Sequence, residues 1–196
     1  MDNSNPKTIY PILMALFMAH FINDLLQIVL QTGFPQFKED YHLSYLQIGM
    51  ITLVFQLSSS IFQPLVGNYT DKHPMPFSFM IGMSFTFFGI ILLAYSYNYH
   101  MILLSAGLIG IGSSIFHPEA SKLAFYVAGG KRGLAQSIFQ IGGNAGTALG
   151  PLLFILFVIP NGQEYIVFFS GLAIVGIFIM GYQFKSLKLL NSCNSE

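Results

Sequence analysis

Charged residues are scarce in this sequence. They make up 8% of its 196 residues, whereas hydrophobic residues make up 54%. An ordinary soluble domain carries about 25% charged residues. A chain of this length cannot hide so much apolar surface inside one water-exposed fold. The composition therefore excludes a typical soluble protein and predicts a protein that crosses a membrane several times.

Three further absences narrow the class of protein. A single cysteine, Cys193, lies in a polar tail and excludes an internal disulfide. The net charge is zero, so nothing in it indicates a nucleic-acid partner. The first apolar run contains His20 and Asp24 and lacks a cleavage site of small residues, so we expect a retained span rather than a signal peptide. We also expect no cofactor.

Six apolar runs are long enough to cross a bilayer, which takes about 20 residues each. We predict an all-α membrane protein in which residues 1–196 form one six-span bundle in the lipid bilayer. The spans are predicted at about 10–32, 44–66, 75–96, 100–121, 134–159 and 165–184. The end of the fourth span stays open, because "LAFYVA" can extend its helix as far as Gly129.

The basic residues are distributed unevenly over the predicted loops. Of the 8 lysines and arginines, only Lys38 lies on the side opposite the two termini. Because lysine and arginine accumulate in cytoplasmic loops, we expect both termini to be cytoplasmic.

Ionisable side chains occur inside the first span. His20 and Asp24 are four residues apart and share a helix face, with Asn23 and Gln27 beside them. A charged group at the bilayer centre costs about 2.5–3.5 kcal/mol, and such groups usually face a bundle interior or water. One interpretation is a cavity lining that handles protons. The other is a satisfied hydrogen-bond cluster between helices.

The second, fourth and fifth spans also carry polar residues. Further candidate cavity-lining residues are Gln56, Gln136, Gln140 and Asn144. In the fourth span, His117 and Glu119 flank Pro118, which favours a kink. Either they form a second ionisable pair in a hydrated site, or Glu119 simply pairs with Lys122.

The first, second, fourth and fifth spans carry polar residues, whereas the third and sixth carry almost none. The distribution of polar residues therefore repeats every three spans. "FQLSSS" in the second span is echoed by "FQIGGN" in the fifth. This pattern predicts two inverted three-helix repeats. In the fifth span, glycines at steps of four indicate close helix packing.

Two motifs carry a resemblance to a known family. "GNYTDKHP" resembles the Gly-x-x-x-Asp-basic loop of the major facilitator superfamily, whose matching positions are Gly67, Asp71 and Lys72. "GTALGP" resembles that superfamily's antiporter motif, whose matching positions are Gly146, Gly150 and Pro151. Longer strings, such as "GIGSSIFHPEASK" and "GLAQSIFQIGGNAGTALGPLL", resemble the fosmidomycin-resistance branch. The arginine that many antiporters carry in the fourth span is not evident; Ala106 stands near that place.

The resemblance implies a transporter in the bacterial inner membrane that exports a small drug-like substrate, such as fosmidomycin, against a flow of protons. It implies that the first and fourth spans line the central cavity. The ionisable residues of these spans are therefore our proton-coupling candidates: His20, Asp24, His117 and Glu119. The resemblance covers only the first of the family's two six-span halves. We therefore expect a second six-span half or a second copy as partner; the alternative is a non-transporting remnant or assembly partner.

An intramembrane enzyme is disfavoured. Ser113 and His117 are four residues apart on one predicted helix, which leaves little room between them for a substrate and oxyanion donors. We predict no catalytic residues and no metal site.

Overall fold

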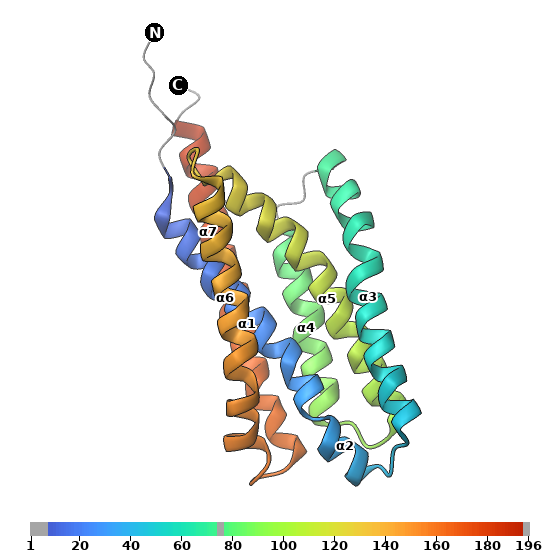
Figure 1. Cartoon of the computed structure of the whole chain (residues 1–196). Helices are drawn as coiled ribbons and strands as arrows, with labels where there is room; N and C mark the ends of the chain where they lie inside the picture. Colours follow the sequence, from blue (N-terminus) through green and yellow to red (C-terminus); the bar gives the residue numbers. More distant parts are fainter. Residues whose placement is uncertain (1–7, 74–76, 194–196) are drawn as a thin grey trace.

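Helices form the whole of the regular structure in the computed structural model, which describes residues 8–73 and 77–193. The elements are α1 (Tyr10–Thr32), α2 (Phe34–Asp40), α3 (Tyr45–Lys72), α4 (Ser78–Ala94), α5 (Tyr99–Tyr126), α6 (Arg132–Leu153), a π-helical turn (Phe154–Val158), a 3-10 turn (Gln163–Ile166) and α7 (Val167–Cys193). Figure 1 shows their arrangement. The predicted all-α membrane fold is confirmed.

The lengths of these helices fit a membrane protein. Five of the described helices are long and apolar enough to cross a bilayer, and α4 is a shorter apolar helix. Helix α1 has the predicted bounds, whereas α3 continues to Lys72 and α5 to Tyr126, past the predicted ends at 66 and 121. The predicted third span began at residue 75, which lies outside the described residues.

A short helix occupies the segment that the sequence analysis treated as a loop after the first span. Helix α2 begins with Pro35 in its first turn, where proline needs no hydrogen-bond partner for its nitrogen and has a favourable backbone angle. Helix α3 follows with a capping box, in which Ser44 Oγ accepts from the backbone of Gln47 and the Gln47 side chain accepts from the backbone of Ser44.

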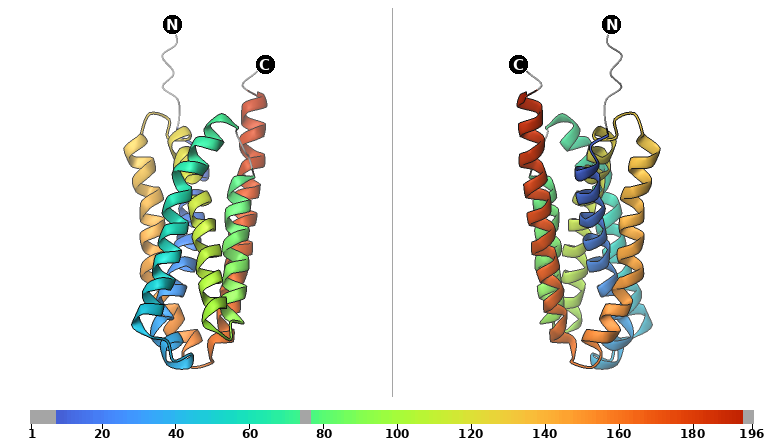
Figure 2. Two further views of the ribbon diagram at one scale, coloured as in Figure 1. Left: turned by 90° about the vertical axis from the view of Figure 1, so that its right-hand side faces the viewer. Right: turned by 90° about the vertical axis from the view of Figure 1, so that its left-hand side faces the viewer.

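The two predicted repeats pair their helices in the same way. The first repeat consists of α1, α3 and α4, and the second of α5, α6 and α7. Between the repeats, α1 packs on α6 just as α5 packs on α3. Likewise α4 packs on α5 and α7 packs on α1, while α4 and α7 contact each other. Exchanging the two repeats converts each of these main contacts into another of them, as expected of two equivalent repeats, whereas the smaller contacts of α5 with α6 and of α1 with α4 have no counterpart of similar extent. Figures 1 and 2 show the beginning of α1 and the end of α7 at one end of the bundle, with α2 at the other.

Glycines bring the paired helices into close contact. Three of them lie on the face of α6 that packs against α1: Gly142, Gly146 and Gly150. A methyl group on Gly146 would collide with the carbonyl oxygen of Phe21, and one on Gly110 of α5 would lie 2.7 Å from the carbonyl oxygen of Phe55 in α3. Both equivalent helix pairs therefore depend on small residues.

Gly146→Ala is expected to lower the free energy of unfolding by about 1–3 kcal/mol, because the added methyl group pushes α6 away from α1. Denaturant titration in detergent, followed by helical circular dichroism, measures the change. The control is Gly171→Ala in α7, where the added carbon would meet no described residue within 4 Å. Equal stability of the two variants would show that the α1–α6 contact has room for a side chain.

The orientation in the membrane is tested by cysteine labelling in a Cys193→Ser background. Lys38→Cys lies in α2, and Lys131→Cys lies just before α6 at the opposite end of the bundle. An impermeant thiol reagent applied to intact cells is expected to label the first variant and spare the second. The reverse pattern would invert the predicted topology.

Candidate functional site

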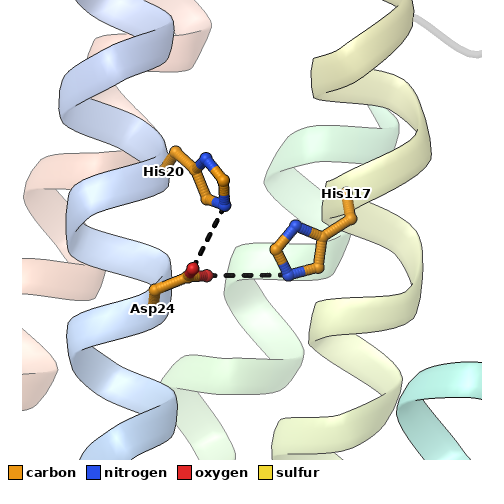
Figure 3. A group of neighbouring side chains, drawn as sticks. All are labelled: His20, Asp24 and His117. Atoms are coloured by element: carbon orange, nitrogen blue, oxygen red, sulfur yellow. Dashed lines mark ion pairs between the residues drawn. The ribbon is translucent and has the colours of Figure 1, made fainter. Parts of the chain in front are cut away.

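Three ionisable side chains meet inside the helix bundle: His20 and Asp24 of α1 and His117 of α5 (Figure 3). We refer to these three residues as the Asp24 cluster. His20 Nε2 lies 3.1 Å from Asp24 Oδ2, and His117 Nε2 lies 3.6 Å from Asp24 Oδ1. The carboxylate therefore lies between two imidazoles, one from each three-helix repeat.

The His20 ring is fixed by α6. Its Nδ1 atom lies 2.8 Å from the backbone oxygen of Phe139, and the two rings stack with centroids 4.0 Å apart. A carbonyl oxygen only accepts hydrogen bonds, so Nδ1 carries a proton. If the ring is neutral, Nε2 carries a lone pair that faces Asp24 Oδ2, and two acceptors at 3.1 Å repel each other. A proton on His20 Nε2 or on Asp24, or another cation between Nε2 and Oδ2, would remove this repulsion.

Two amides hold the Asp24 carboxylate. Its Oδ1 atom accepts from Asn23 Nδ2 at 3.1 Å and from Gln27 Nε2 at 3.4 Å. Asn23 is completely buried, and its Oδ1 atom has no hydrogen-bond partner among the described residues. Gly143 of α6 leaves space for the cluster, because a methyl group there would lie 2.5 Å from both Asp24 Oδ2 and His20 Nε2.

The other predicted cavity-lining residues belong to α3 and α6. Gln136 donates a 2.7 Å hydrogen bond to Ser121 Oγ and so joins α6 to α5. Three more are exposed on the outside of this six-span chain: Gln56, Gln140 and Asn144. They belong to α3 and α6, the helices that pack on α5 and α1 respectively.

A second polar cluster lies at the end of the bundle that carries the termini; we refer to it as the Glu119 clasp. Glu119 accepts hydrogen bonds from Thr70 Oγ1 at 2.5 Å, Lys122 Nζ at 3.1 Å and Ser78 Oγ at 3.2 Å. Lys122 Nζ also lies 2.6 Å from Asp71 Oδ1. The clasp joins α3, α4 and α5, and the Glu119–Lys122 alternative of the sequence analysis is the one observed.

His117 and Glu119 do not form the ionisable pair that was the other interpretation. Residues two apart on a helix point in different directions, so His117 faces Asp24 while Glu119 faces α3 and α4. The contact between His117 and Asp24 was missed, because sequence spacing cannot show which residues of two separate helices meet.

The residues of the loop motif contribute unequally. Asp71 is largely exposed and pairs with Lys122, while Lys72 is exposed. Among the described residues, a methyl group on Gly67 would meet Pro118 Cβ alone, at 4.0 Å, so packing against them does not require glycine there. In the antiporter motif, Gly146 and Gly150 pack on α1, and Pro151 lies in the last turn of α6 before the π-helical turn.

Comparison with known proteins identifies the family. Residues 16–187 match the model of the Major Facilitator Superfamily. The chain belongs to this superfamily. Its helices and this membership make it a multi-pass membrane protein.

Two relatives agree with the predicted branch of the superfamily. The chain is 46% identical over 179 residues to the fosmidomycin resistance protein of Escherichia coli, covering 91% of this chain and 44% of that protein. It is 42% identical over 175 residues to an uncharacterized MFS-type transporter, YfnC, of Bacillus subtilis, covering 89% and 43%. The chain thus spans less than half the length of these relatives.

Replacing Glu119 is expected to loosen the clasp. Glu119→Ala leaves the buried Thr70 and Ser78 hydroxyls without this acceptor, and the free energy of unfolding falls by about 1–3 kcal/mol. Detergent unfolding measures the change, and Glu164→Ala, at an exposed carboxylate, serves as the control. An unchanged stability in Glu119→Ala would mean that the clasp contributes nothing to the fold.

Proposed function

We propose that this chain forms the first half of a proton-driven transporter that exports a small drug-like anion, such as fosmidomycin, across the bacterial inner membrane. The observation that carries the proposal is the position of Asp24 between His20 and His117. Membership of the superfamily and similarity to a fosmidomycin resistance protein support transport as the activity. Both termini face the cytoplasm in this proposal, as the loop charges favour.

The chain is proposed to work with a second six-span half. Alternating access requires one half of a transporter to rock against another. Helix α3 exposes several large apolar side chains that nothing in this chain covers, among them Leu57, Ile61 and Leu65. The partner is either the second half of a longer protein, a separate chain or a second copy of this chain.

The Asp24 cluster is proposed to bind the transported proton. In this proposal the proton is held between the Asp24 carboxylate and one of the two imidazoles that face it. Because the cluster joins α1 to α5, gaining or losing a proton changes the attraction between the two repeats. Proton and substrate occupy the same cavity in alternation, which couples inward proton flow to export.

Glu119 is proposed to lie on the inward route of the proton. In the conformation described, its carboxylate is engaged by Lys122, Thr70 and Ser78. It becomes available to a proton only when the Glu119 clasp opens, so clasp opening and proton release to the cytoplasm are linked in this proposal.

Transport in vesicles tests the proposal, with this chain joined to the second half of the Escherichia coli fosmidomycin resistance protein. Asp24→Asn is expected to abolish proton-driven accumulation of fosmidomycin while substrate exchange without a gradient persists. The control Asp40→Asn removes an exposed carboxylate at the far end of the bundle. If Asp24→Asn accumulates substrate at the normal rate, Asp24 is only structural. If the unsubstituted assembly exchanges no substrate, the chain is not the transporting half proposed here.

A further inference from the structure

We propose that the Asp24 cluster also binds a divalent transition-metal ion, with Zn²⁺ as the best fit. The ligands would be His20 Nε2, one oxygen of Asp24 and His117 Nε2. These atoms lie within 4.8 Å of one another, and among the described residues they form the one group of this kind. No metal site was predicted from the sequence, in which the three ligands lie on two separate spans.

The spacing of the ligand atoms is close to that of a zinc site. Zinc binds nitrogen and carboxylate oxygen at about 2.0–2.2 Å, so two ligands of one tetrahedral ion lie about 3.3–3.5 Å apart. The Asp24 carboxylate is 3.1 Å from His20 Nε2 and 3.6 Å from His117 Nε2. His20 is thus at a suitable distance from Oδ2 and His117 from Oδ1 of the same carboxylate, and small shifts of these side chains would bring all three ligands onto one ion.

The surroundings hold the ligands as metal sites usually do. A metal-bound histidine generally donates its second ring N–H to a carboxylate, a backbone carbonyl or water, and His20 Nδ1 makes that contact with Phe139 O at 2.8 Å. This bond directs the Nε2 lone pair toward Asp24. Two amides fix the carboxylate, and one of them, Asn23, has a buried side-chain oxygen with no partner among the described residues.

The type of ligand selects the type of ion. Two imidazoles and one carboxylate suit Zn²⁺, Co²⁺ or Ni²⁺, whereas Mg²⁺ and Ca²⁺ prefer sites made of oxygen. Three protein ligands leave a fourth position open for water or for an anionic ligand. The ion would also connect α1 to α5. Where the proposed transport function holds, Zn²⁺ would compete with the proton for the same atoms and inhibit export.

The experiment titrates the purified full-length chain, free of any polyhistidine tag, with Zn²⁺ in calorimetry and with Co²⁺ in visible absorption. One ion per chain is expected, with the intense absorption of four-coordinate Co²⁺. His117→Gln is expected to weaken binding at least tenfold and to remove that absorption. His117→Cys, which retains a zinc ligand, is expected to keep tight binding.

The matched control removes the other three of the 5 histidines in the triple variant His42→Gln, His73→Gln and His100→Gln. It is expected to bind like the unsubstituted chain. Absence of one-to-one binding, or loss of binding in the triple variant with retention in His117→Gln, would overturn the proposal. Circular dichroism establishes that each variant is folded. Because no transport is measured, a negative result leaves the proposed function intact, and a failure of transport leaves the metal site intact.

Discussion

The carboxylate of Asp24, placed inside an apolar helix bundle, is the constraint on which the surrounding structure depends. A charge in such a place is costly unless it is paired and hydrogen-bonded. The pairing requires two imidazoles and two amides within reach. It also requires a residue without a side chain at Gly143, where any added carbon would enter the cluster. Satisfying one acid thus determines how α1, α5 and α6 approach one another.

Polar contacts tie the bundle together at three levels, with apolar packing between them. The Asp24 cluster lies inside, and the Glu119 clasp lies at the end that carries the termini. At the opposite end, Tyr41 donates a 2.6 Å hydrogen bond to Gln163, which donates a 2.7 Å bond to Ser96 Oγ. Between these levels, glycines bring α6 against α1 and α5 against α3. These polar contacts therefore join the helices at both ends of the bundle as well as inside it.

Local geometry was predictable from the sequence, and contacts between distant helices were not. The bounds of α1 and the approach of His20 to Asp24 follow from one apolar run and one helical turn. The contact of His117 with Asp24 depends on how two spans cross, so it was missed. Helix α3 was predicted too short because hydropathy falls before the helix ends, whereas α5 ends at Tyr126, within the extension that the sequence left open. Their last turns carry polar residues, including Asp71 and Lys122, that bond to one another. Helix α2 was missed because its polar, proline-containing segment is typical of a loop.

The central claim is that Asp24 joins the two three-helix repeats through His117. A double-mutant cycle measures this directly, with the free energy of unfolding determined for Asp24→Asn, His117→Gln, the double variant and the unsubstituted chain. A coupling energy of about 1 kcal/mol or more is predicted, as for residues in direct contact. Effects that add within about 0.5 kcal/mol, as for distant and independent sites, would contradict it.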